Sequence, residues 1–178
     1  MGIIRWFAGL FSPRVTRPER PAASAPAAKV EKKYAKERRD GPRTNAREGT
    51  RVLIIDDSPT IVALLRKLLR QNGFVTLEAG DAEQGIAIAQ AEVPDLIFLD
   101  IVLPGMNGFA ALRQLRRAAP TKTIPIIMIS GNEQATEQFY AQRIGADDFM
   151  KKPFSRAEVF TRIERLLDVD LVPKRPGG

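Results

Sequence analysis

From Arg51 onward, short apolar runs alternate with stretches in which apolar residues recur at helical spacing. The first run, Val52–Asp56, is β-branched and aliphatic, which is typical of a strand buried on both faces. The next stretch places a set of apolar side chains on one helix face. This set consists of Ile61, Leu64, Leu65, Leu68 and Leu69. The alternation repeats along the chain and predicts five strand–helix pairs.

The predicted strands are Val52–Asp56, Phe74–Ala79, Asp95–Asp100, Ile124–Ile129 and Asp147–Met150. Four predicted helices extend from Pro59 to about Gln71, from Asp81 to about Ala91, over Glu133–Ile144 and over Arg156–Leu167. A further helix follows the Leu103–Gly108 loop, with Phe109, Leu112 and Leu115 facing inward. Ser58 and Asp81 are expected N-caps, and Asn72-Gly73 ends the first helix. Repeated strand–helix units predict a parallel sheet with helices on both faces. Ligands of such sheets bind at the carboxyl ends of the strands.

Composition separates the first 50 residues from the rest. Residues 1–50 hold 12 Lys and Arg against 5 Asp and Glu, whereas residues 51–178 hold 16 of each. Residues 13–50 are rich in Pro, Ala, Lys and Arg without a sustained apolar period, so we predict a disordered linker. The predicted organisation is a basic extension at 1–50, a globular domain at 51–170 and a short tail at 171–178. After Leu167 too little chain remains for a DNA-binding or enzymatic output domain.

The chain begins with an apolar and aromatic segment, residues 1–12, that is shorter than the roughly 20 residues needed to span a bilayer. Two interpretations stay open: a short helix lying on a membrane surface, or an unstructured end. The basic residues that follow favour anionic lipid over nucleic acid. A docking segment for a protein partner and a start codon assigned too far upstream are further alternatives. We expect a cytoplasmic protein, with peripheral contact at the inner membrane left open.

The sequence contains neither Cys nor His. This excludes disulfides, Cys- or His-ligated metals, and catalysis by Ser-His-Asp or Cys-His groups. Phosphoryl chemistry on this chain would therefore depend on carboxylates, hydroxyls and Lys.

Such groups stand where the predicted strands end. Asp56 and Asp57 follow the first strand, Asp100 ends the third, Ser130 follows the fourth and Lys152 follows the fifth. Singly, each has an ordinary explanation, such as helix capping or a solvated side chain. Together, at one sheet edge, three carboxylates need a cation, and oxygen ligands suit Mg²⁺. A carboxylate can also act as a nucleophile that forms an acyl phosphate.

Four segments resemble the receiver-domain family of response regulators: VLIIDDSPT, LIFLDIVLPGMNG, IIMISG and DFMKKPFS. The resemblance covers about Arg51–Asp168 and is closest to stand-alone CheY-like regulators, including those of twitching-motility systems. It implies a flavodoxin-like, doubly wound, five-stranded parallel sheet with strand order 2-1-3-4-5.

The resemblance also implies roles for the strand-end residues. Asp100 would be the phosphoacceptor, and Asp56 and Asp57 would bind Mg²⁺ together with Asp100 and the Val102 backbone carbonyl. Lys152 would pair with the phosphoryl group, and the Lys152–Pro153 peptide would be cis.

Two further residues would form the switch of the family. Ser130 would supply the switch hydroxyl, and Phe149 stands at the aromatic switch position, without the hydroxyl of a tyrosine. Phosphorylation would draw Ser130 toward the phosphoryl group and let Phe149 pack inward. The apolar side chain of Val102 would limit water access, from which we expect a phosphoryl lifetime of minutes or longer.

The implied function is that of a single-domain response regulator. A histidine kinase or phosphotransfer protein would donate the phosphoryl group, and a protein target would read the face formed by the fourth helix, fifth strand and fifth helix. Its only catalysis would be Mg²⁺-dependent self-phosphorylation and dephosphorylation. Two alternatives remain. One is a receiver that binds partners without phosphorylation. The other is a phosphatase of the haloacid dehalogenase type, whose nucleophilic Asp is followed by a second Asp two residues later, a spacing that Asp56 and Asp100 both lack.

Overall fold

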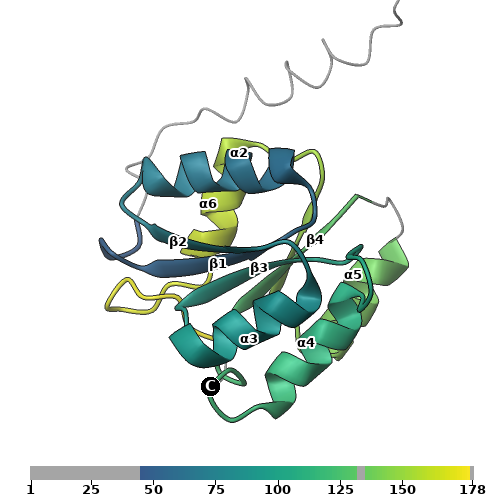
Figure 1. The fold of residues 1–178 in the computed structure, drawn as a ribbon. Coiled ribbons are helices and arrows are strands. Elements are labelled where there is room, and N and C mark those ends of the chain that lie inside the picture. Colours follow the sequence, from purple (N-terminus) through teal and green to yellow (C-terminus); the bar gives the residue numbers. More distant parts are fainter. Residues whose placement is uncertain (1–44, 132–134, 177–178) are drawn as a thin grey trace, which may run out of the picture.

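A computed structural model of the chain describes residues 45–131 and 135–176 and contains one five-stranded sheet with helices on both sides (Figure 1). The strands are β1 (Arg51–Ile55), β2 (Val75–Ala79), β3 (Leu96–Asp100), β4 (Ile126–Ser130) and β5 (Asp148–Lys151). The helices are α2 (Pro59–Arg70), α3 (Ala82–Glu92), α4 (Gly108–Arg117), α5 (Ala135–Arg143) and α6 (Arg156–Glu164). All strand pairs are parallel, in the order β2-β1-β3-β4-β5. The predicted fold class and strand order are confirmed.

Alternate residues of each central strand face opposite sides of the sheet, and both sides are apolar. In β1, Leu53 and Ile55 belong to one buried cluster while Val52 and Ile54 belong to the other. Helices α2 and α6 cover one face, and α3, α4 and α5 cover the other (Figure 1). A strand buried on both faces must be apolar throughout, which explains the continuous aliphatic runs in the sequence.

The helix starts follow the predicted caps only in part. Asp81 accepts a hydrogen bond from the Gln84 amide at 2.7 Å, as an N-cap should. Ser58 occupies the N-cap position of α2, but its side chain makes no capping bond. Instead, its amide donates to Asp56 Oδ1 at 2.9 Å. Leu64, one of the residues that the sequence places on the apolar face of this helix, is 39% exposed, because the buried residues of α2 are Leu65 and Leu69.

The edge of the sheet where the strands begin holds both ends of the described chain. Just before β1, Ala46 and Thr50 are already buried. The Arg47 amide donates to the Leu171 carbonyl at 2.9 Å, which joins the residues before β1 to those after α6. Residues 45–50 and 168–175 are therefore bonded to each other at the edge opposite the carboxyl ends of the strands.

A buried ionic cluster fixes the same edge. Asp147, 3% exposed, accepts from Arg116 Nη2 at 2.6 Å and from Arg175 Nε at 2.8 Å. Its Oδ2 also accepts from the Ile126 amide at 2.8 Å. Burial lowers the pKa of Arg116 to about 10 although the charge of Asp147 raises it, so the guanidinium stays charged near neutral pH.

Within the described part of the chain, no helix combines the length and the apolar character required to cross a bilayer. The predictions for residues 1–12, and for most of the extension, concern residues outside the described ranges.

Candidate functional site

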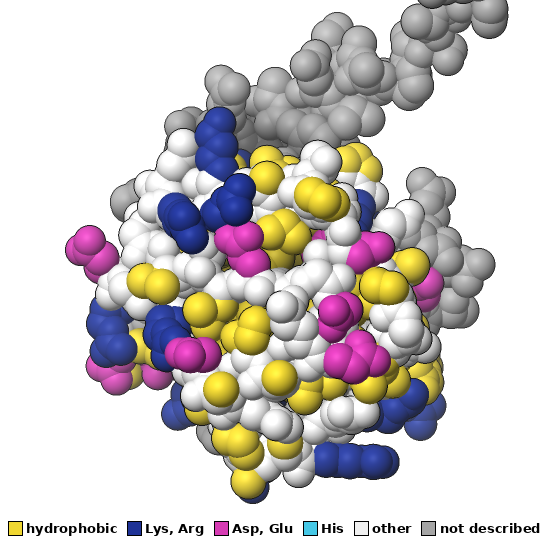
Figure 2. Space-filling view, in the orientation of Figure 1, with side chains coloured by type: hydrophobic (Ala, Val, Ile, Leu, Met, Phe, Trp, Pro, Cys, Tyr) yellow, Lys and Arg dark blue, Asp and Glu magenta, His cyan; other side chains and the backbone are white. Residues whose placement is uncertain are grey.

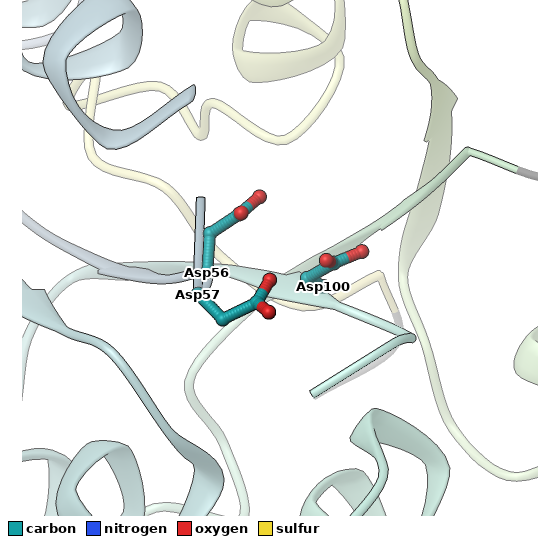
Figure 3. A group of neighbouring side chains, drawn as sticks. All are labelled: Asp56, Asp57 and Asp100. Atoms are coloured by element: carbon teal, nitrogen blue, oxygen red, sulfur yellow. The ribbon is translucent and has the colours of Figure 1, made fainter. Parts of the chain in front are cut away.

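The structure brings three carboxylates together at the carboxyl edge of the sheet. Asp56 and Asp57 lie directly after β1, and Asp100 ends β3, which pairs with β1. Each residue offers one oxygen within 4.8 Å of those of the other two (Figure 3). Asp56 and Asp100 are 1% and 2% exposed, whereas Asp57 is exposed. The site therefore combines two buried acids with one that solvent reaches.

Lys152 is the cation of this cluster. It follows β5, and its Nζ lies 2.8 Å from Asp56 Oδ2 and 2.9 Å from Asp100 Oδ2. Its amide donates to the Ser130 carbonyl at 2.7 Å, which anchors it beside β4. The Lys152–Pro153 peptide is cis, as expected. The Lys152 ammonium thus contacts two of the three carboxylates, and its single positive charge does not balance the three negative charges of the cluster.

The pKa values follow from this imbalance. Burial raises the pKa of Asp100, Lys152 lowers it by hydrogen bonding, and the charge of Asp56 raises it again, so the net shift is upward. Burial would lower the pKa of Lys152, but hydrogen bonds and charges from Asp56 and Asp100 outweigh it and raise that pKa. The raised pKa keeps the Lys152 ammonium protonated. Asp100 ionises less readily than an ordinary carboxyl because no second cation within the described ranges offsets its burial and the charge of Asp56.

The donor set fits a divalent ion. Asp100 Oδ1 is buried and receives no hydrogen bond of good geometry from the described residues. The three carboxylate oxygens lie within 4.8 Å of one another, and the ligands of an octahedral Mg²⁺ lie about 3 to 4.2 Å apart. An ion of this kind could be held by Asp56, Asp57 and Asp100 and would supply the missing positive charge. The Val102 carbonyl, in the loop after β3, stays a predicted further ligand.

Ser130 ends β4 beside this cluster and is fully buried. Its neighbour Ile129 pairs with Asp100 across the sheet, and Ser130 itself pairs with Lys151. The Ser130 hydroxyl donates a hydrogen bond to the Glu137 carboxylate of α5. The hydroxyl is thus held by a residue that the sequence analysis did not single out.

Phe149, in β5, lies in the buried cluster on the α3–α4–α5 face and is 2% exposed. The sequence analysis expected its ring to pack inward only after phosphorylation. In the structure it is already packed inward while the Ser130 hydroxyl is bonded to Glu137.

Helix α5 carries the largest exposed aromatic side chains of the described residues, Phe139 at 63% and Tyr140 at 42% exposure. Tyr140 stacks edge-on against Phe109 of α4 and accepts a hydrogen bond from Arg113 at 2.6 Å.

At the carboxyl edge of the sheet, on the right of Figure 2, acidic side chains gather on the surface.

Comparisons with known proteins agree with this geometry. The sequence model of the family described as "Response regulator receiver domain" matches residues 52–164. The chain is similar to Protein PilH of Pseudomonas aeruginosa, with 39% identity over 117 residues, 66% of this chain and 97% of PilH. Among its other curated relatives are transcriptional regulators, of which it spans about half the length, 48% and 52% in two cases.

Solved structures show the same fold. Chemotaxis protein CheY4 of Vibrio cholerae superposes with a TM-score of 0.64 at 27% identity, covering 67% of this chain and 99% of that one. The receiver domain of sensor histidine kinase PA1611 from Pseudomonas aeruginosa superposes with a TM-score of 0.60 at 28% identity, covering 66% and 95%. That structure has a magnesium ion coordinated in its active site cleft.

Proposed function

This chain belongs to the response regulator receiver family, and on that premise we propose that Asp100 accepts a phosphoryl group from a partner histidine kinase or phosphotransfer protein. Receiver domains are signalling proteins that interact with such partners, not enzymes with a separate substrate. The observation that carries the proposal is Asp100 Oδ1, a buried carboxylate oxygen that receives no hydrogen bond of good geometry from residues 45–131 and 135–176, beside a fixed ammonium and two further acids.

In the proposed transfer, one oxygen of the Asp100 carboxylate attacks the phosphorus of a phosphohistidine. The phosphorus–oxygen bond forms as the phosphorus–nitrogen bond breaks, and the electron pair returns to the imidazole, which takes up a proton. Lys152 keeps its charge and pairs with a phosphoryl oxygen. Mg²⁺ held by Asp56, Asp57, Asp100 and the Val102 carbonyl would neutralise charge on the phosphoryl group.

The added group brings about −1.5 to −2 charges and strong acceptor oxygens to the end of β3. We propose that the Ser130 hydroxyl donates to one of these oxygens, and that α5, β5 and α6 carry the change to a protein target. Because Phe149 is already buried, its inward packing is not the expected signal in this chain. Residues 51–170 would carry this switch, in the cytoplasm, with the basic extension 1–50 as a separate contact segment.

The test uses the full chain, Mg²⁺ and acetyl phosphate, with Asp100→Asn as the control. Intact mass should show one base-labile phosphoryl group on the wild type and none on the variant. The same adduct on Asp100→Asn would move the acceptor elsewhere. A lack of any adduct, from acetyl phosphate or from a phosphorylated histidine kinase, would mean that the site is not an acceptor.

A further inference from the structure

The Ser130 hydroxyl has one proton to donate. In the structure it donates that proton to Glu137, the third residue of α5. In the proposed function, which this inference rests on and deepens, it must donate to a phosphoryl oxygen on Asp100. A serine hydroxyl donates only one hydrogen bond at a time, so the two bonds exclude each other.

The bond to Glu137 is of the stronger kind. Its acceptor is a carboxylate, and its donor is fully buried, so water competes poorly for the hydroxyl. Ser130 cannot relocate as a whole, because its carbonyl accepts the Lys152 amide at 2.7 Å and its strand is paired on both sides. Only rotation of the side chain can redirect the hydroxyl toward Asp100.

The other family switch residue does not hold the unphosphorylated state here. Phe149 is already buried at 2% exposure, so Ser130 does not have to move to make room for its ring. The hydrogen bond from Ser130 to Glu137 must break when the hydroxyl turns.

We propose that Glu137 is a positioning residue that holds the Ser130 hydroxyl away from Asp100 until phosphorylation, and so opposes the phosphorylated conformation. Breaking the bond removes one tie between the first turn of α5 and the end of β4, which links the phosphoryl group to this helix. A hydrogen bond to a charged group corresponds to about ten- to a hundredfold in an equilibrium constant. Removal of the Glu137 carboxylate should favour the phosphorylated conformation by that factor.

A negative charge at Glu137 could oppose phosphorylation in a second way, by repelling the anion directly. The two explanations differ in their dependence on Ser130. Competition for the proton vanishes when Ser130 has no hydroxyl, whereas charge repulsion persists. A double-mutant cycle on these two residues therefore separates them.

The experiment titrates the full chain with beryllofluoride in saturating Mg²⁺ and follows backbone amide resonances to half-saturation. Glu137→Ala should lower the half-saturating concentration about ten- to a hundredfold, and Glu137→Gln, which keeps a neutral acceptor, should lower it less. In a Ser130→Ala background, Glu137→Ala should have almost no effect. Glu83→Ala is the matched charge control, because the Glu83 carboxylate lies beside Gly105, in the loop that follows β3. This variant should change the affinity for beryllofluoride at most about twofold.

The outcomes distinguish this inference from the proposed function. If the wild type binds beryllofluoride but Glu137→Ala binds no tighter, the inference fails and the proposed function stands. An equal gain in the Ser130→Ala background also overturns it, because the effect is then charge repulsion. If the wild type shows no Mg²⁺-dependent binding, the proposed function and this inference fail together. Glu137→Gln keeps nearly the same shape and guards against misfolding of the Ala variant.

Discussion

Gly108 lies against the backbone of the proposed acceptor, which makes its replacement by Ala a sharp test of the structure. A Cβ atom at Gly108 would lie 2.0 Å from the Asp100 carbonyl oxygen and 2.9 Å from the Asp100 carbonyl carbon. The Gly108 amide also donates to the Ile101 carbonyl at 2.9 Å, so the close approach is fixed from both sides. The loop after β3 can fold back this tightly only with a residue that has no side chain.

The size of the effect follows from these distances. The oxygen must move by at least about 1 Å, and it belongs to the backbone of β3, so no side chain can rotate to relieve the contact. Overpacking of this kind costs about 1–3 kcal/mol or more, against a gain of about 0.4–1 kcal/mol from a stiffer unfolded chain. We expect Gly108→Ala to lower the free energy of unfolding by about 2 kcal/mol, and the shift of Asp100 to reduce phosphorylation by acetyl phosphate.

Two other glycines calibrate the measurement. A Cβ at Gly85, inside α3, would meet three side-chain atoms of the buried Ile55, Cδ1 at 2.5 Å, Cγ1 at 2.8 Å and Cγ2 at 2.9 Å. These atoms belong to a side chain and not to the backbone, and Ala adds up to about 1 kcal/mol of helix propensity. A Cβ at Gly80 would meet nothing within 4 Å. Urea unfolding should therefore rank the losses Gly108→Ala, then Gly85→Ala, then Gly80→Ala. A loss at Gly108 within about 0.5 kcal/mol of that at Gly80 would refute the reasoning.

Three further predictions concern charge. Mg²⁺ at a hundredfold excess over its dissociation constant should add about 2.7 kcal/mol to the free energy of unfolding and so raise the thermal midpoint. Asp57→Asn should remove most of this gain, and an unchanged midpoint in the wild type would contradict the metal site. Without metal, Asp100→Asn should stabilise the fold by about 0.5–2 kcal/mol at neutral pH, because the raised pKa of Asp100 shows that its charge is unfavourable there. The folded state binds the proton of the Asp100 carboxyl more tightly than the unfolded state does, so the stability that Asn adds should shrink as the pH falls through the folded pKa of Asp100. A stability gain that grows on acidification would contradict the raised pKa. Asp147→Ala should cost about 3–5 kcal/mol in urea unfolding, since it removes the carboxylate from the Arg116 guanidinium, whose side chain is only 10% exposed. Arg175→Ala should cost at most about 1 kcal/mol, because the Arg175 side chain is 31% exposed, and equal losses would contradict the burial of the Asp147 side chain.

The order of strands and helices was predictable because each apolar run has a local cause. A strand buried on both faces, such as β3, must be apolar throughout, and Asp81 caps α3 through a bond to a residue only three positions away. The acidic cluster was predictable for a related reason. Parallel strands place their carboxyl ends at one edge, so residues that follow strands meet there whatever the rest of the chain does.

The features that the sequence did not reveal depend on partners from different elements. The bond from Ser130 to Glu137 depends on how α5 is placed against the end of β4. Asp147 pairs with Arg175 and Arg116, which lie 28 and 31 positions away, and the pattern of apolar residues does not predict either ion pair. A lone carboxylate at a strand start resembles a solvated residue until its depth is known. The partners of Asp147 are Arg116, in the last turn of α4, and Arg175, after α6, and neither lies next to Asp147 in the sequence.

Residues 45–50 are joined to residues 168–175 at the edge of the sheet where the strands begin. This position determines which face of the domain points into solution when the protein is attached to a surface or to a fusion partner. A fusion partner, dye or sensor surface joined directly to residue 45 would sit on the far side of the domain from Asp100, with the full length of the strands between them. Immobilisation through that end should leave the acidic edge facing a partner in solution. It is the natural orientation for measuring how a kinase docks.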